Sequence, residues 1–310
     1  MSHHLRYQST PWATHHVTSR CIQGFAFLTP HDHIADICRG VLGYSLHVYR
    51  EVIKLHHYVF LSNHFHLLLS SETTADLARF MCHFKGNLAR ELGRVHDWHD
   101  SFWQKRYSSE EVLDEEGLIE IFKYITQNSV KEGLVEHPSQ WTGLHGYHQL
   151  VEDREVSGPW VNRSDLYIAR KCDKSAQESD FTSFFPVLLS PPPMWADMSE
   201  SRYREHCEEL CEEAVFEAIR SRSKRAIGMS QVLGQHIYQP RFTKRSDRPL
   251  CRTKCIERMR AYKADYYTFK ALFQEASAVL RDAIHRGVEH LSVRFPSGGV
   301  PLFGGYVAPL

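Results

Sequence analysis

The chain has 310 residues, of which 42% are hydrophobic and 12% aromatic, a composition typical of a folded globular protein. Its 37 basic and 37 acidic residues balance, so the overall charge neither favours nor excludes a nucleic-acid partner. No run of about 18 apolar residues is present, and the first residues lack the apolar segment of a secretory signal. We therefore expect a cytoplasmic protein with no membrane-spanning helix.

Periodic segments in the first half of the chain predict, in order, a strand, a helix, two strands, a helix, a strand and a helix. Their expected ranges are 15–22, 32–49, 51–61, 64–70, 74–95, 103–113 and 118–130. This order is that of a split β-α-β fold, ferredoxin-like or RRM-like, with an antiparallel sheet and helices on one face. We therefore predict the α+β class, with the second face of the sheet left open.

The second half of the chain predicts a different organisation. After about residue 150 the sequence becomes polar and ends in a proline-rich stretch, Leu189–Pro193, which is typical of a linker. Helical patterns then return near 198–222 and 255–285. The sequence thus predicts a folded part at 1–150, a linker at 151–195 and a mostly helical C-terminal region at 196–310.

A local excess of positive charge marks this C-terminal region. Between Arg220 and Lys263 thirteen basic residues are opposed only by Asp247 and Glu257, and aromatic side chains are interleaved with them. Such a stretch indicates contacts with nucleic-acid phosphates, the alternative being a basic loop without function. Its candidate DNA-binding residues are Arg222, Lys224, Arg225, Lys244, Arg245, Arg248 and Arg252.

Two histidines lie in the most informative stretch, which reads as strand, turn and strand from Tyr58 to Leu69. Because side chains alternate along a strand, His64 and His66 share one face, while Phe65, Leu67 and Leu69 share the other. Two imidazoles about 7 Å apart along a strand can converge on one metal ion. The alternative is a half-buried strand with two of the 21 histidines of the chain.

The predicted helix at 118–130 carries a tyrosine and an asparagine away from its apolar stripe. Tyr124 and Asn128 are four residues apart, so they lie one above the other on the same side of the helix. Two neutral imidazoles and a neutral amide leave a divalent cation electropositive, which makes a phosphate oxygen a natural further ligand. A phenol is a poor nucleophile without a metal or a base. The alternative is a surface tyrosine on an amphipathic helix.

Cysteine spacing offers a second kind of metal site. Two pairs, Cys207 with Cys211 and Cys251 with Cys255, have three residues between their members and together could form a four-thiolate zinc site. Both pairs lie in helical patterns without the glycine and proline turns of a zinc knuckle. A His/Cys metalloprotein unrelated to DNA is therefore one alternative for the whole protein.

The segment Asn63–Leu69, followed downstream by Tyr124–Val135, resembles the HUH single-tyrosine transposases, and among them the REP-associated tyrosine transposases. The resemblance covers about residues 10–150. Its supporting segments are His16–Arg20, Phe102–Tyr107 and His137–Trp141.

The resemblance implies that His64 and His66 are metal ligands, that Tyr124 is the nucleophile and that Asn128 is the third ligand. Ser129 stands where the family often has proline, so Gln127 is the reserve ligand.

The function implied by this resemblance is cleavage and rejoining of single-stranded DNA, often beside a hairpin. The reaction is a transesterification through a 5′-phosphotyrosine and uses Mg²⁺ or Mn²⁺. Arg20, Lys105 and Arg106 lie in the matched segments and are further candidate DNA-binding residues. We expect a nucleoid-associated monomer or homodimer. The alternative on the same scaffold is a non-catalytic or domesticated DNA-binding protein.

Overall fold

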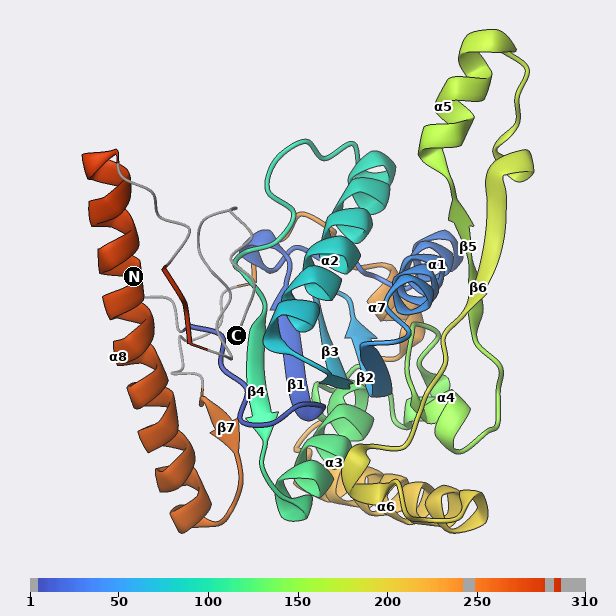
Figure 1. The fold of residues 1–310 in the computed structure, drawn as a ribbon. Coiled ribbons are helices and arrows are strands. Elements are labelled where there is room, and N and C mark those ends of the chain that lie inside the picture. The colour runs from blue at the N-terminus through green and yellow to red at the C-terminus, as the bar shows by residue number, and fades with distance from the viewer. Residues whose placement is uncertain (1–4, 242–248, 288–292, 297–310) are drawn as a thin grey trace.

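The computed structural model describes residues 5–241, 249–287 and 293–296 (Figure 1). A five-stranded sheet lies at its centre, with the strand order β2-β3-β1-β4-β7. All neighbouring strands are antiparallel except β4 and β7, which are parallel. The strands are β1 (Ala13–Arg20), β2 (Ile53–Leu61), β3 (His64–Ser71), β4 (Ser108–Val112) and β7 (Cys251–Arg252).

Alternating side chains give the sheet two apolar faces. Phe65, Leu67 and Leu69 of β3 join the core formed with α1 (Asp32–Val48) and α2 (Thr74–His96). Leu68 joins a second core on the other face, under α3 (Glu115–Lys131), and α6 (Glu200–Ser221) packs on α3. Side-chain caps fix two of the helix starts, because Thr73 accepts from an amide of α2 and Asp114 from an amide of α3.

The predicted α+β class, the split β-α-β order and the helical C-terminal region are confirmed. One feature differs: helices cover both faces of the sheet, and α3 lies on the face that was expected to be open. The physical reason is that Val59, Leu61 and Leu68 point to this face, and their apolar surface is buried only when a helix covers it.

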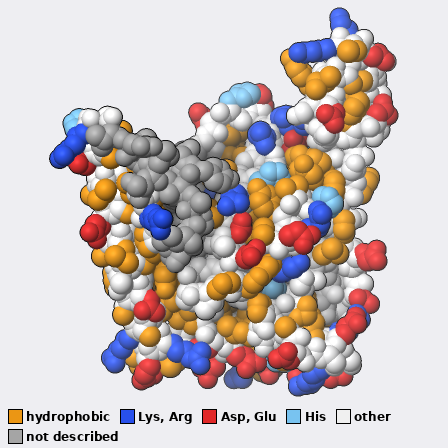
Figure 2. All heavy atoms as spheres, viewed as in Figure 1, with side chains coloured by type: hydrophobic (Ala, Val, Ile, Leu, Met, Phe, Trp, Pro, Cys, Tyr) orange, Lys and Arg blue, Asp and Glu red, His pale blue; other side chains and the backbone are white. Residues whose placement is uncertain are grey.

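The segment expected to be a linker contains regular structure. It forms a two-stranded sheet from β5 (Ser157–Val161) and β6 (Thr182–Pro186), with α5 (Arg163–Cys172) between the strands. The hairpin packs on α1, and α5 projects from the body as an arm (Figure 1). Hydrophobic and charged side chains are mixed on the arm (Figure 2), where Tyr167, Ile168 and Phe184 are largely exposed.

The C-terminal region ends in α8 (Ile256–Arg286), which runs beside β7 at the sheet edge (Figure 1). Tyr7, near the N-terminus, packs against Tyr262, Tyr266 and Phe269 of this helix. Within the described ranges no helix has the length and apolar character needed to cross a membrane. The remaining elements are the short helices α4 (Tyr147–Leu150) and α7 (Met229–Leu233) and the 3₁₀ turns Ile22–Gly24, Pro138–Gln140, Glu178–Phe181 and Pro193–Trp195.

Glycine at position 40 allows α1 and β5 to approach closely, because a Cβ there would lie 1.7 Å from the carbonyl oxygen of Pro159. We expect Gly40→Ala to push the hairpin away and to lower the free energy of unfolding by about 1–3 kcal/mol, measured by urea denaturation. The control is Gly86→Ala in α2, where a Cβ meets nothing within 4 Å. That change should raise the free energy of unfolding by up to about 1 kcal/mol. Equal stability of the two variants would contradict the close approach.

Candidate active site

Both histidines of β3 lie on the sheet face that α3 covers. Their ring centroids are 5.0 Å apart. His66 is buried, while His64 at the strand start is partly exposed, opposite Arg20 of β1. The local alternation predicted for the strand is therefore present, and it brings the two imidazoles together at one end of the sheet.

Asn63 sets the proton position on His64. Its Nδ2 donates to the carbonyl oxygen of Gly24 at 3.1 Å, so its Oδ1 is the atom that faces His64 Nδ1, at 2.6 Å. A carbonyl oxygen only accepts, so Nδ1 of His64 carries the hydrogen and Nε2 keeps a lone pair. Burial, assisted by Arg20, lowers the pKa of His64 to about 4. At neutral pH this imidazole is uncharged and its Nε2 keeps its lone pair.

Tyr124 reaches the histidines from α3. Its ring centroid is 5.2 Å from that of His66 and 5.9 Å from that of His16, and both contacts are edge-to-face. Burial raises the pKa of Tyr124, and a hydrogen bond with Asn128 opposes this shift. The phenol is therefore protonated at neutral pH and needs activation before it can act as a nucleophile.

Asn128 lies on the same side of α3 as Tyr124 and is 2% exposed. The helix continues past Ser129 to Lys131, so serine at that position leaves Asn128 in helical register with Tyr124. Its Oδ1 is buried without a hydrogen-bond partner. Gln127 is half-exposed instead. The structure thus favours Asn128 over Gln127 as the amide of the site.

Two buried atoms without a hydrogen-bond partner, Nε2 of His66 and Oδ1 of Asn128, make this face suitable for a cation. Burial, and then His64 and His16, hold the pKa of His66 well below its ordinary value, so its imidazole is neutral. Imidazole nitrogen and amide oxygen are ordinary ligands of Mn²⁺ and Mg²⁺ sites that also bind phosphate. The residues present therefore fit a divalent metal ion.

Comparison with known proteins finds a family match that includes the candidate site residues. Residues 44–128 match the sequence profile of a family described as "Transposase IS200 like", and the match contains His64, His66, Tyr124 and Asn128. This segment of the chain is therefore similar to IS200-like transposases. The resemblance predicted from the sequence is thereby confirmed. No curated protein matches the chain significantly.

Two solved structures resemble the chain distantly. One is a REP-associated tyrosine transposase bound to a REP hairpin, with 20% identity and a TM-score of 0.41, over 48% of this chain and 84% of that one. The other, from Deinococcus radiodurans R1, is described as a candidate transposase. It has 18% identity and a TM-score of 0.29, over 38% of this chain and 92% of that one.

The basic residues near the transposase segment remain accessible. Lys105 and Arg106 are exposed, and their segment lies beside the end of β1, where the amide of Gln104 donates to the carbonyl oxygen of Arg20. Arg20 itself is half-buried and donates to the carbonyl oxygen of Arg241. Arg20 therefore lies opposite the partly exposed His64, and the segment with Lys105 and Arg106 lies beside the same end of β1.

Several cations of the predicted C-terminal basic run have partners within the protein. Arg222 forms an ion pair with Glu136, and Arg252 contacts Glu110 at 3.0 Å and Glu120 at 3.7 Å. These contacts give both arginines structural roles that the sequence did not predict. Lys224 and Arg225 are exposed. The candidates Lys244, Arg245 and Arg248 lie outside the described residues.

The cysteine pairs do not form the alternative zinc site. Cys207 and Cys211 are buried in α6 in the core under α3, whereas Cys251 lies on β7 beside Glu111 of β4. Burial raises the pKa of Cys211 to about 12, which disfavours a thiolate. In the part of the chain that the structure describes, no group of three or more His, Cys, Asp or Glu side chains is arranged to hold a metal ion.

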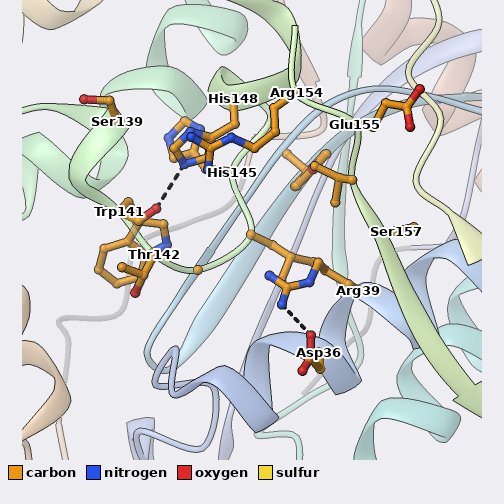
Figure 3. A pocket seen from close by; sticks show the side chains of 14 residues that line it. Asp36, Arg39, Ser139, Trp141, Thr142, His145, His148, Arg154, Glu155 and Ser157 are labelled. Atoms are coloured by element: carbon orange, nitrogen blue, oxygen red, sulfur yellow. Dashed lines mark hydrogen bonds and ion pairs between the residues drawn. The ribbon is translucent and has the colours of Figure 1, made fainter. Parts of the chain in front are cut away.

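A separate cavity of about 380 Å³ lies between the start of α1 and the loops at 139–145 and 154–157 (Figure 3). None of the candidate site residues lines it. Two of its polar side chains have protein partners, since Arg39 contacts Asp36 at 2.5 Å and His148 donates to the carbonyl oxygen of Trp141 at 3.0 Å. None of its lining residues has a buried side-chain nitrogen or oxygen without a hydrogen-bond partner. The cavity therefore offers no set of unpartnered groups comparable to the one beside Tyr124.

Proposed function

We propose that the protein cleaves and rejoins single-stranded DNA through a covalent 5′-phosphotyrosine at Tyr124. The observation that supports this most strongly is the contact of Tyr124 with His66 of the same chain, beside the unpartnered Oδ1 of Asn128. One chain supplies the nucleophile and the candidate ligands, so these groups require no second subunit.

His64, His66 and Asn128 would hold a divalent ion, Mg²⁺ or Mn²⁺. When bound, this ion supplies Lewis-acid polarisation of the scissile phosphate. The nucleophile comes from the protein itself. The Tyr124 oxygen attacks phosphorus and loses its proton to water. The bond from phosphorus to the 3′ oxygen breaks, and this oxygen takes a proton from water and leaves as a 3′-hydroxyl. The phosphotyrosine is itself a phosphodiester, so the energy of the broken bond is conserved. A 3′-hydroxyl can therefore attack it and rejoin the DNA without a nucleoside triphosphate.

Cations at the end of β1 and in the neighbouring segment support a DNA substrate. Arg20, Lys105 and Arg106 lie at the exposed end of β1 and of the segment that follows α2. Phosphate contacts of this kind position a strand without reading its sequence. A similar solved transposase is bound to a REP hairpin. We therefore propose single-stranded DNA beside a hairpin as the substrate, with Lys224 and Arg225 as further contacts.

The test is covalent capture. The full-length protein is incubated with a 5′-labelled and a 3′-labelled hairpin oligonucleotide carrying single-stranded flanks, with Mn²⁺ or with EDTA. We expect an adduct that survives denaturing electrophoresis only with Mn²⁺, that retains the 3′ label, and that peptide mass spectrometry places on Tyr124. Removal of the metal should abolish it, because the phosphate then lacks its Lewis acid.

Two outcomes would contradict the proposal. One is salt-dependent DNA binding with no adduct in any divalent metal, which is the behaviour of a non-catalytic DNA-binding protein on this scaffold. The other is an adduct on a residue other than Tyr124.

A further inference from the structure

A lysine lies over the ring of the candidate nucleophile. Lys131 is in the last turn of α3, and its position in the helix puts it on the same side as Tyr124. Its Nζ lies 5.4 Å from the centroid of the Tyr124 ring, a distance typical of a cation–π contact. The histidines of the site reach this ring from the sheet, whereas Lys131 reaches it from the helix itself.

The charge of Lys131 is available to a ligand. Its side chain is exposed, and among the described residues its ammonium has no ion pair or hydrogen bond, although Glu132 follows it directly. Lys123, on the same helix, is different. Its Nζ contacts Glu217 at 2.5 Å and Glu213 at 3.3 Å, both on α6. The fold therefore neutralises one lysine of α3 and leaves the other beside the phenol.

The reaction proposed for Tyr124 needs positive charge at this place. A phosphodiester carries one negative charge, and attack by a phenol that has lost its proton adds a second. While the bond from the Tyr124 oxygen to phosphorus forms and the bond to the 3′ oxygen breaks, this charge lies largely on the nonbridging oxygens. A cation beside those oxygens therefore stabilises the transition state more than the bound substrate.

Lys131 is within reach of these oxygens. The phosphorus becomes bonded to the Tyr124 oxygen, so the phosphate must lie at the hydroxyl end of the ring. A lysine side chain is a flexible four-carbon stem with three donors at its end, so rotations of the stem can carry the ammonium from the ring to the phosphate. Before DNA binds, the contact with the ring keeps the ammonium next to the nucleophile.

We infer, on the basis of the function proposed above, that Lys131 is a further catalytic residue, whose ammonium binds a nonbridging oxygen of the scissile phosphate while Tyr124 attacks. Lys131 keeps its proton throughout, and the proton of Tyr124 still goes to water. The same contact persists in the phosphotyrosine, so it also assists the rejoining step. A lysine that only held DNA would stabilise the bound substrate and the transition state equally.

The first test separates the reaction rate from DNA binding. Lys131→Met keeps the stem and removes the charge. With Mn²⁺ and a saturating hairpin oligonucleotide, we expect this variant to form the Tyr124 adduct about 10²-fold more slowly than the wild type. Its DNA affinity, measured by fluorescence anisotropy, should stay within a few-fold. Lys131→Arg retains a cation and should recover most of the rate.

The arm provides a matched control. Lys171 of α5 also lies over a tyrosine ring, with its Nζ 4.5 Å from the centroid of the Tyr167 ring. Lys171→Met removes the same kind of contact on a helix that projects away from the body (Figure 1). It should change neither the rate of adduct formation nor the DNA affinity.

The second test restores the charge chemically. Lys131→Cys should be as slow as Lys131→Met. Alkylation with 2-bromoethylamine builds an ammonium on this cysteine and should recover most of the rate, whereas iodoacetamide adds a neutral group and should not. Wild-type protein treated with each reagent is the control for the exposed Cys82 and Cys172. If the aminoethylated protein stays as slow as the iodoacetamide product, the lost ammonium is not the cause and the inference is wrong.

These results separate the inference from the proposed function. If the wild type forms the adduct and Lys131→Met forms it equally fast, the inference is wrong and the proposed function stands. If the rate of Lys131→Met falls only because its DNA affinity falls, Lys131 is a DNA contact and not a catalytic residue. A wild type that forms no adduct in any divalent metal would overturn the proposed function, and the role of Lys131 with it.

Discussion

The Tyr124→Phe protein is expected to form no covalent DNA adduct, a loss of at least about 10³-fold relative to wild type. The substitution removes one oxygen and keeps the ring. The edge-to-face contacts of that ring with His66 and His16 therefore remain, and so does the packing of α3.

Two controls make this prediction specific. Tyr147→Phe, in α4, removes a phenol oxygen from a tyrosine outside the site and should form the adduct normally. DNA binding by Tyr124→Phe, measured by fluorescence anisotropy, should remain within a few-fold of wild type, because the lost oxygen acts on the reacting phosphate only. An adduct in Tyr124→Phe equal to that of wild type would show that another residue is the nucleophile.

Acidification from pH 7 to pH 5 is expected to destabilise the fold by about 6 kcal/mol through three buried histidines. His15, His56 and His145 are almost fully buried, and burial is the main cause that lowers their pKa values, to about 3 for His15 and His145 and about 4 for His56. In the unfolded chain their pKa is near 6.5, so the unfolded state binds more protons as the pH falls below that value. Between pH 7 and pH 5, each of these histidines therefore lowers the free energy of unfolding of the protein by about 2 kcal/mol.

Glu111 is also buried, and burial raises its pKa, so this one carboxyl group stabilises the folded state as the pH falls. It opposes the effect of the three histidines but is a single group. Stability is therefore greatest above about pH 6.5 and is lost towards the folded-state pKa values near 3 to 4. Because a domain is typically stable by 5–15 kcal/mol, a loss of this size is a large fraction of the total.

Urea denaturation at pH 5, 6 and 7 measures this loss. The variant His56→Gln removes one titrating group, so the stability difference between it and the wild type should shrink by about 2 kcal/mol from pH 7 to pH 5. His99→Gln is the matched control, since the His99 side chain is exposed and is not buried on folding. A free energy of unfolding that stays constant between pH 5 and 7 would show that the buried histidines are not held neutral.

The sequence by itself determined the parts of this protein that depend on local patterns. Period-two alternation placed His64 and His66 on one face of a strand and Phe65 on the other, because side-chain direction in a strand is set by neighbouring residues alone. Helical spacing placed Tyr124 and Asn128 on one side of α3 for the same reason. The order of the elements was enough to predict the split β-α-β sheet.

Tertiary structure alone decided which of these faces meet. Apolar side chains on both sides of the sheet brought α3 over His66, and only this packing shows that Tyr124 contacts a histidine of its own chain. The contact of His16 with Tyr124 was not predicted, because only the pairing of β1 with β3 and the packing of α3 bring these residues together. Arg252 was predicted to contact DNA, but the addition of β7 to the sheet edge placed it on Glu110. Burial of apolar surface and pairing of charges join residues that are distant in sequence, so these contacts could not be predicted from local sequence patterns.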